Sequence, residues 1–327
     1  GDSLNFNDVY EFGQFVDVLT LELENVNTEA LKKLKSEGKR VYPDPEKLEI
    51  IQDKGLQKQF YEKIKVPSSS FRFFENKQEI INSINNGNLF FPFVQKLRKG
   101  GYDGRGVSII NTKDDLEILL DGASEVEDFV DIDKEISAIV ARNERGEIKC
   151  HPTVEMEFNP NANLVEKLIC PSTLPDKIEN EAEDIAVKII SELDLYGLLA
   201  VEMFVDKNNK VWVNEIAPRP HNSGHYTIEA CQTSQFENCV RAVCNLPLGA
   251  PDMIVPAAVM INLLGERSGS GIPDSPIEAL GHGRAWLHLY GKNDCRVGRK
   301  MGHITAVGNT LDEALGRARR AAEGFIW

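Results

Sequence analysis

Two glutamates on neighbouring predicted strands could bind a divalent cation. The stretch Leu198–Glu215 is predicted as a hairpin whose loop is Asn208-Asn209, because both residues tolerate the left-handed backbone of a two-residue turn. That turn predicts that Glu202 faces Glu215 with Cβ atoms about 4.5–5.5 Å apart, where like charges are destabilising. A positive group should therefore lie between them, and Mg²⁺ suits oxygens that share the ion with phosphate. The alternatives are neutralisation by a nearby Lys or Arg, or a register that differs by one residue.

A glycine-rich stretch over residues 96–106, with the sequence Lys-Leu-Arg-Lys-Gly-Gly-Tyr-Asp-Gly-Arg-Gly, lies between two predicted strands. Its four glycines within seven residues let backbone amides approach an anion, and Lys96, Lys99 and Arg105 add positive charge. It is neither a Walker A loop nor a dinucleotide-binding fingerprint. Its position predicts a flap over a phosphate chain, and an ordinary glycine-rich hairpin turn is the alternative.

Two further stretches favour anions. Arg219, His221 and Asn222 follow Glu215 closely, so a guanidinium, an imidazole and an amide lie near the proposed metal site, where a small anion is favoured. A turn whose polar groups bond to one another is the alternative. Residues 292–300 carry a net charge of +3 in an acidic chain. That run predicts a pocket for a phosphomonoester, although a solvated surface is the usual explanation of such a run.

The elements that position these residues begin with a predicted βαβ unit. Residues 16–24 alternate as a strand, Thr28–Ser36 is typical of a capped helix, and residues 41–42 form a second short strand. Such a unit needs neighbouring strands, and none lies upstream, so we expect the remainder of a doubly wound domain. Further along, we expect single helices over residues 46–64 and 227–245.

Composition limits the classes of function. The chain has 327 residues, a net charge of −14 and a pI near 5, which argues against a nucleic-acid partner. No apolar run reaches the ~20 residues of a membrane span. The six cysteines form no Cys-x-x-Cys pair, so we expect free thiols and a cytoplasmic protein. Half of the net charge lies in residues 1–30, which hold seven acidic residues and no Lys or Arg.

Together these stretches resemble the ATP-grasp superfamily and, within it, the N5-carboxyaminoimidazole ribonucleotide synthase family. The resemblance covers nearly the whole chain. It is carried by Gln-Asp-Lys at 52–54, the stretch at 96–106, Glu127–Val130, the Asn-Glu-Ile-Ala-Pro-Arg-Pro-His-Asn-Ser-Gly-His run at 214–225, and Gly-Arg-Lys-Met-Gly-His at 298–303. Family members begin with a glycine-rich strand, turn and helix that this sequence lacks, so we expect that about two βα units are missing.

The resemblance implies an α/β, partly α+β, ATP-grasp fold with a truncated doubly wound N-terminal domain and a strand-rich C-terminal domain. The implied domains are residues 1–50, 51–247 with a lid at about 71–130, and 248–327. The implied ligands are ATP and Mg²⁺, with bicarbonate and 5-aminoimidazole ribonucleotide as substrates, and the implied assembly is a homodimer. Another ATP-grasp ligase, of the formate-dependent glycinamide ribonucleotide transformylase or biotin carboxylase type, and a non-catalytic nucleotide-binding fragment are the alternatives.

The resemblance also assigns residues to roles. The implied ATP-binding residues are Lys54, Lys96, Gly101, Tyr102, Asp103, Gly104, Arg105, Gly106, Glu127, Asp128, Phe129, Val130, Glu135, Asn214 and Glu215. The implied ribonucleotide-binding residues are Tyr102, Asp103, Arg105, Lys292, Arg299 and Lys300. The implied catalytic residues are Arg219, His221, Asn222 and Lys300, of which the first three would cradle bicarbonate. The implied Mg²⁺ ligands are Glu202 and Glu215, in agreement with the hairpin argument.

Overall fold

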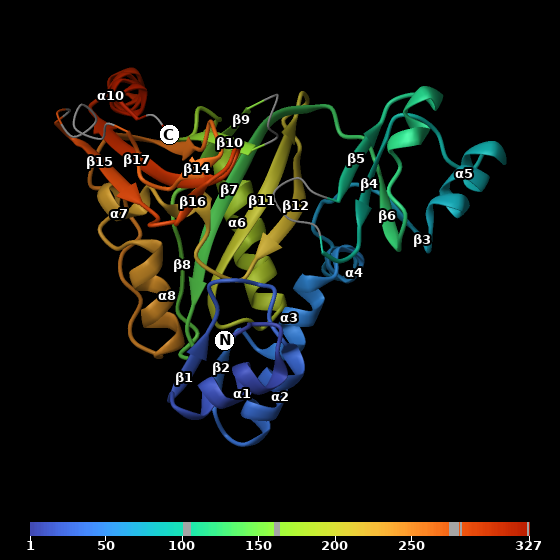
Figure 1. The fold of residues 1–327 in the computed structure, drawn as a ribbon, viewed down its shortest axis with the longest axis horizontal. Helices are drawn as coiled ribbons and strands as arrows, with labels where there is room; N and C mark the ends of the chain where they lie inside the picture. The colour runs from blue at the N-terminus through green and yellow to red at the C-terminus, as the bar shows by residue number, and fades with distance from the viewer. Residues whose placement is uncertain (101–105, 160–163, 275–280, 282, 326) are drawn as a thin grey trace. The chain divides into compact units, whose positions relative to one another are not determined.

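The computed structural model describes residues 1–327 with the exception of 101–105, 160–163, 275–280, 282 and 326 (Figure 1). The chain divides into two compact units. Unit 1 contains residues 1–133, 188–196 and 201–219, and unit 2 contains residues 134–187, 197–200 and 220–327. None of the helices in the described ranges is long and apolar enough to cross a membrane.

The elements alternate between helix and strand along much of the chain. In chain order they are α1 Phe6–Gln14, β1 Val18–Thr20, α2 Thr28–Ser36, β2 Arg40–Tyr42, α3 Pro45–Gln52, α4 Lys54–Ile64, β3 Phe71–Phe74, α5 Lys77–Asn85, β4 Phe93–Leu97, β5 Val107–Ile110, η1 Lys113–Ile118, β6 Ser124–Asp128, β7 Ile132–Arg142, β8 Ile148–Cys150, β9 Val154–Asn159, β10 Leu164–Cys170, α6 Asp176–Glu192, β11 Gly197–Asp206, β12 Val211–Ala217, η2 Asn222–Gly224, α7 Thr227–Ala230, α8 Gln235–Val243, β13 Ala257–Leu264, β14 Gly269–Ser270, β15 Ala285–Leu289, β16 Asp294–Cys295, β17 Lys300–Gly308 and α10 Leu311–Glu323.

These strands form four sheets in the described part of the chain. The largest has the order β12-β11-β7-β9-β10-β13-β17-β15, with β8 beside β7. A four-stranded antiparallel sheet has the order β3-β6-β4-β5, and β14 pairs with β16. In the remaining sheet, β1 pairs with β2 in parallel, so the predicted βαβ unit is confirmed. The expected mixture of helices and sheets, strand-rich toward the C-terminus, is also confirmed.

Two helices that we predicted as continuous are each divided, and polar side chains explain both breaks. Asp53 has an extended backbone between α3 and α4, and its carboxylate accepts hydrogen bonds from the N–H groups that open α4. Cys231 is extended between α7 and α8, and the side chain of Ser234 caps α8. Periodicity alone does not detect such breaks, because the apolar spacing continues through the caps.

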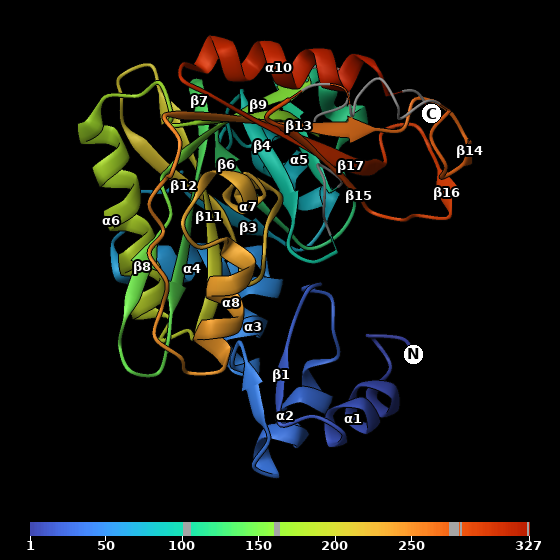
Figure 2. The same cartoon turned by 90° about the vertical axis from the view of Figure 1, so that its left-hand side faces the viewer.

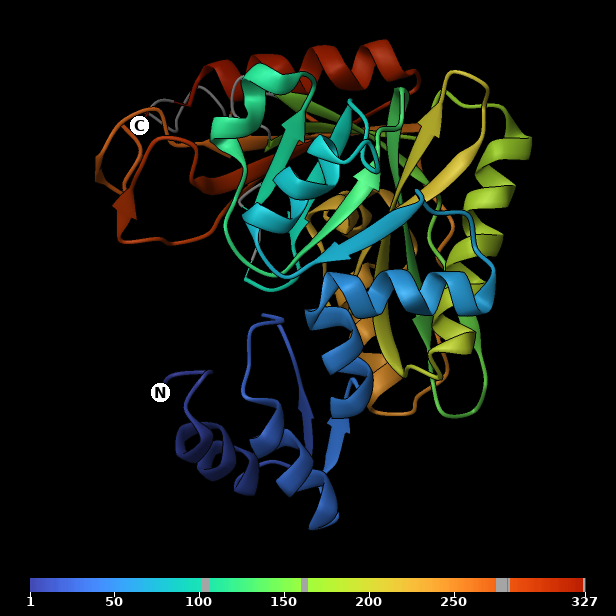
Figure 3. The same cartoon turned by 90° about the vertical axis from the view of Figure 1, so that its right-hand side faces the viewer.

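Each unit has its own apolar cores. In unit 1, α5 lies on the four-stranded sheet (Figure 3). Its Ile80 packs with Phe93, Ile110 and Val126 of that sheet. In unit 2, the small side chains of Ala314 and Ala318 let α10 lie close against β13 and β17 (Figure 2).

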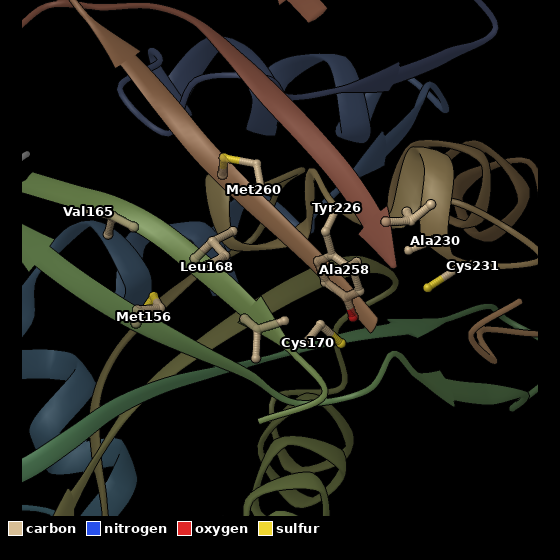
Figure 4. Close-up of a cluster of buried hydrophobic side chains, with 11 residues drawn as sticks. Met156, Val165, Leu168, Cys170, Tyr226, Ala230, Cys231, Ala258 and Met260 are labelled. Atoms are coloured by element: carbon tan, nitrogen blue, oxygen red, sulfur yellow. The ribbon is translucent and has the colours of Figure 1, made fainter. Parts of the chain in front are cut away.

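A second core of unit 2 joins β9, β10 and β13 to α7. Met156, Leu168, Ala258 and Met260 pack there with Tyr226, and Cys170 and Cys231 belong to the same cluster (Figure 4). All six cysteines of the chain are free thiols, as predicted.

Candidate active site

The β11–β12 hairpin corrects one detail of the prediction. Its loop has three residues, Lys207 to Asn209, because the Asp206 N–H donates to the Lys210 carbonyl at 3.0 Å and Asn209 has a φ of 60°. The predicted two-residue turn was therefore wrong, and near the loop the register differs by one residue. Asp206 stabilises the longer loop, because its carboxylate accepts hydrogen bonds from the backbone N–H groups of Asn208 and Lys210.

Farther from the loop, both predicted carboxylates are half-buried. Buried and half-buried residues alternate from Val211 to Asn214, but Asn214 and Glu215 are both half-buried and Ile216 is buried. Glu202 is the half-buried residue among buried neighbours in β11.

Two lysines from distant segments contact neighbouring residues of β12. Lys54, the first residue of α4, forms an ion pair with Glu215, and Lys96 of β4 donates to the Asn214 side chain at 2.8 Å. The structure thus brings together four of the predicted ATP-binding residues. The ion pair with Lys54 neutralises Glu215. This agrees with the alternative explanation of the two glutamates, in which a nearby lysine supplies the positive charge.

The side chain of Glu127 lies in a buried ionic network. Its carboxylate contacts Lys96 at 2.8 Å and Lys58 at 3.2 Å, and it accepts a hydrogen bond from Ser69 at 2.5 Å. Lys58 is 1% exposed and also donates to Ser69 at 2.8 Å. Burial opposes ionisation of Glu127, but the two lysines hold its pKa below the ordinary range. We therefore expect this carboxylate to orient Lys96, since its oxygens are already engaged.

A second glutamate on the same face of β6 has a pKa shifted in the opposite direction. Glu125 lies two residues before Glu127 and opposite Lys96 in the β4–β6 register, and it is 1% exposed. Burial and the neighbouring charge of Glu127 raise the pKa of Glu125 to about 8. Glu125 therefore holds a proton at neutral pH. The charges of Lys58 and Lys96 are then balanced by the single carboxylate of Glu127.

A hollow lies beside the end of β6 in unit 1. It has a volume of about 290 Å³ and is lined by Ser69, Ser70, Asp128, Phe129, Val130, Asp131, Asp206, Lys207, Asn208 and Trp212. Three of the predicted ATP-binding residues, Asp128 to Val130, thus line a space of the right scale for a planar base. Trp212 is fixed at its wall by a 3.0 Å hydrogen bond from its indole N–H to Asp206.

The predicted anion-binding residues divide between the units. Arg219 belongs to unit 1, where its guanidinium pairs with Glu24 at 2.9 Å. His221 and Asn222 belong to unit 2, and the Asn222 amide exchanges two hydrogen bonds with Asn262 of β13, at 2.8 and 2.9 Å. Asn262 is itself held by the Val165 carbonyl. The Asn222 side chain is therefore fixed by a strand that the sequence pattern did not connect to it.

The basic run in unit 2 is partly neutralised from within. Asp294 accepts from Arg296 at 2.7 Å and also pairs with Arg299, whose guanidinium donates to the Asp294 carbonyl at 2.8 Å. The Lys292 ammonium lies 5.7 Å from the centre of the Tyr290 ring, and Lys300 begins β17. Arg299 is thus held in place by Asp294.

The remaining predicted residues have mixed outcomes. Gly101, Tyr102, Asp103, Gly104 and Arg105 lie outside the described residues. Gly106 accepts a hydrogen bond from the Leu97 N–H at 2.8 Å, so it continues the β4–β5 pair. Glu135 is in unit 2, in β7 opposite Met156.

Sequence reasoning missed Lys58, Ser69 and Glu125. A signal existed for two of them, because Lys58 is one helical turn after Lys54 and Glu125 shares the strand face of Glu127. Within the described ranges, no group of three or more His, Cys, Asp or Glu side chains could hold a metal ion. The carboxylates of Glu202 and Glu215 supply hard oxygen donors, which fit Mg²⁺ only if phosphate or water completes the shell.

Comparison with known proteins identifies the class of fold. A family model for the ATP-grasp domain matches residues 59–236, one for the ribonucleotide synthetase preATP-grasp domain matches 1–52, and one for the phosphoribosylaminoimidazole carboxylase C-terminal domain matches 258–317. The fold and site thus define an ATP-grasp protein.

Relatives narrow the class. The chain is 37% identical over 316 residues to an N5-carboxyaminoimidazole ribonucleotide synthase of Bacillus subtilis, covering 94% of this chain and 80% of the relative. A crystal structure of the Thermotoga maritima synthetase matches with a TM-score of 0.88 at 40% identity, covering 100% of this chain and 86% of the other. An Aspergillus clavatus synthase in complex with ADP and 5-aminoimidazole ribonucleotide matches with a TM-score of 0.88 at 29% identity, covering 99% and 85%. The chain belongs to the N5-carboxyaminoimidazole ribonucleotide synthase family.

Proposed function

We propose that this chain is an ATP-dependent carbon–nitrogen ligase of purine biosynthesis that carboxylates 5-aminoimidazole ribonucleotide to its N5-carboxy form. The observation that carries the proposal is the ionic cluster of Lys54, Lys96, Glu127 and Glu215 beside the hollow at Phe129. The lysines supply fixed positive charge for a polyphosphate, and the hollow supplies space for a base. Solved structures of family members contain ATP, or ADP together with 5-aminoimidazole ribonucleotide.

The proposed reaction uses bicarbonate as the carbon source. An oxygen of bicarbonate attacks the γ-phosphorus of ATP, the bond to ADP breaks, and carboxyphosphate forms. Carboxyphosphate then releases phosphate and CO₂, and the exocyclic amine of the ribonucleotide attacks the carbon and loses a proton. The chain's contribution is to hold the reactants together and to balance the charge that moves onto the phosphoryl oxygens.

Within this reaction the described residues take distinct roles. Lys54 and Lys96 would contact the phosphates, the hollow lined by Asp128 to Val130 would take the adenine, and Glu135 the ribose. Glu202 and Glu215 would hold Mg²⁺, which supplies charge neutralisation at the phosphates when bound. Arg219, His221 and Asn222 would bind bicarbonate. Lys292, Arg299 and Lys300 would bind the ribonucleotide phosphate.

The proposal extends to organisation. We propose regions 1–50, 51–247 and 248–327 as the three domains, a homodimer as the assembly, and the cytoplasm as the location. The free thiols of the chain suit a reducing compartment.

A phosphate-release assay with single omissions tests the function. We expect release from ATP to require Mg²⁺, bicarbonate and 5-aminoimidazole ribonucleotide together. Release that needs formate and glycinamide ribonucleotide would instead favour the transformylase class. ATP binding without substrate-dependent release would favour a nucleotide-binding module, and either result would overturn the proposal.

A further inference from the structure

The imidazole of His221 is fixed by the backbone that follows it. His221 is the N-cap of the short turn η2, and its Nδ1 accepts a hydrogen bond from the Ser223 N–H at 3.3 Å. A backbone amide can only donate, so Nδ1 must be unprotonated. In a neutral imidazole the single ring proton then lies on Nε2.

Two buried hydroxyls continue this arrangement. The Oγ of Ser223 lies 2.8 Å from His221 Nδ1 and 2.8 Å from the Oγ of Ser137 in β7. Both serines are only 1% exposed, so water does not compete for these bonds. Because Nδ1 accepts, the Ser223 hydroxyl donates to the ring, and its oxygen is left to accept from Ser137. The chain of bonds therefore has one direction, from β7 to the ring.

The backbone of His221 is held as firmly as its ring. The side-chain oxygen of Gln235 accepts from the His221 N–H at 2.9 Å, and its nitrogen donates to the His221 carbonyl at 2.7 Å. These two partners determine the orientation of the amide, because an N–H needs an acceptor and a carbonyl needs a donor. A Cβ at Gly224 would lie 2.4 Å from that Gln235 oxygen, so glycine is required for the approach.

We propose that Ser137, Ser223 and Gln235 are positioning residues that hold His221 as the Nε2–H tautomer. In this state the ring donates a hydrogen bond through Nε2 to an oxygen of bicarbonate or of the acyl phosphate, and Nε2 does not accept a proton as a base. The identity of the anion rests on the proposed function, whereas the tautomer does not.

The tautomer can be measured without substrate. The full chain labelled with ¹⁵N-histidine gives long-range proton–nitrogen correlations for each ring, and His221→Asn identifies the His221 signals by their loss. We expect Nδ1 to have the shift of an unprotonated nitrogen and Nε2 that of a protonated one. A protonated Nδ1 in the neutral ring would overturn the proposal, whatever the catalytic activity of the chain.

The positioning role is tested by kinetics. In Ser223→Ala we expect the KM for bicarbonate to rise about tenfold, the effect of one lost hydrogen bond, with little change in the KM for ATP. Ser223→Thr keeps the hydroxyl and should restore much of the loss. Ser172→Ala is the matched control, because this hydroxyl is also buried in unit 2 but bonds to Glu179 and Leu174. Equal effects of Ser223→Ala and Ser172→Ala would refute the positioning role.

These measurements separate the inference from the proposed function. If the chain shows no bicarbonate-dependent turnover but His221 has the expected tautomer, the proposed function fails and the positioning of the ring stands. If turnover depends on bicarbonate but Nδ1 is protonated, the function stands and the inference fails.

Discussion

The proton on Glu125 leads to a prediction that can be worked out in magnitude. Burial and the charge of Glu127 raise the pKa of Glu125 to about 8 in the folded chain, against an ordinary value of 4.5. Between these two values the folded state holds a proton that the unfolded state has released. The free energy of unfolding contributed by this group is therefore complete below pH 4.5 and is lost as the pH rises toward 8, at about 1.4 kcal/mol per pH unit.

Glu125→Gln removes this dependence while keeping the shape of the side chain. At pH 7 the wild-type chain should have lost about 3 kcal/mol of stability relative to mildly acid solution, and the variant should not lose it. We expect the variant to unfold at a higher urea concentration than the wild type at pH 7 to 8, and the two to converge near pH 5. Glu62→Gln, at an exposed position of α4, is the control and should follow the wild type.

The assay is urea unfolding of both variants and the wild type across this pH range. A second readout is ATP affinity above pH 8, where ionised Glu125 would draw on the charge of Lys96 and weaken binding in the wild type alone. If the pH dependence of unfolding is the same in Glu125→Gln and the wild type, then Glu125 does not hold the proton and our account of the buried network is wrong.

Three further predictions follow from the site and the core. Glu215→Gln should lower Mg²⁺-dependent phosphate release by more than about 100-fold, since the ion stabilises several kcal/mol of charge, and unchanged release would contradict the metal assignment. Lys96→Met should raise the KM for ATP by about 10- to 100-fold through loss of a charge-assisted hydrogen bond, and an unaltered KM would remove Lys96 from the nucleotide site. Met260→Ala, fully buried in unit 2, should lower the free energy of unfolding by about 2–5 kcal/mol in urea titration; a loss below about 1 kcal/mol would show that the core collapses around the gap.

Local pattern was enough to predict many of the elements that carry the site. The helix Thr28–Ser36 has the predicted bounds, because its apolar spacing and its cap act within a few residues. The hairpin was located correctly for the same reason. Its loop length was not, because Asp206 stabilises a third loop residue by two hydrogen bonds that the Asn208-Asn209 signal does not reveal.

The sequence by itself determined the residue types available to the site: the two hairpin glutamates, the lysines, and the run from Arg219 to His225. Only the tertiary structure decided which side chains form ion pairs and which of them hold a proton. Lys58, Ser69, Lys96 and Glu127 meet in one buried network although up to 69 residues of chain separate them. Burial raises the pKa of Glu125, whereas the contacts with Lys96 and Lys58 hold the pKa of Glu127 low. Likewise Gln235 reaches the backbone of His221 only because α8 packs over Gly224. Spacing along a chain predicts local geometry, but the protonation of a side chain depends on the dielectric and the neighbours that folding brings to it.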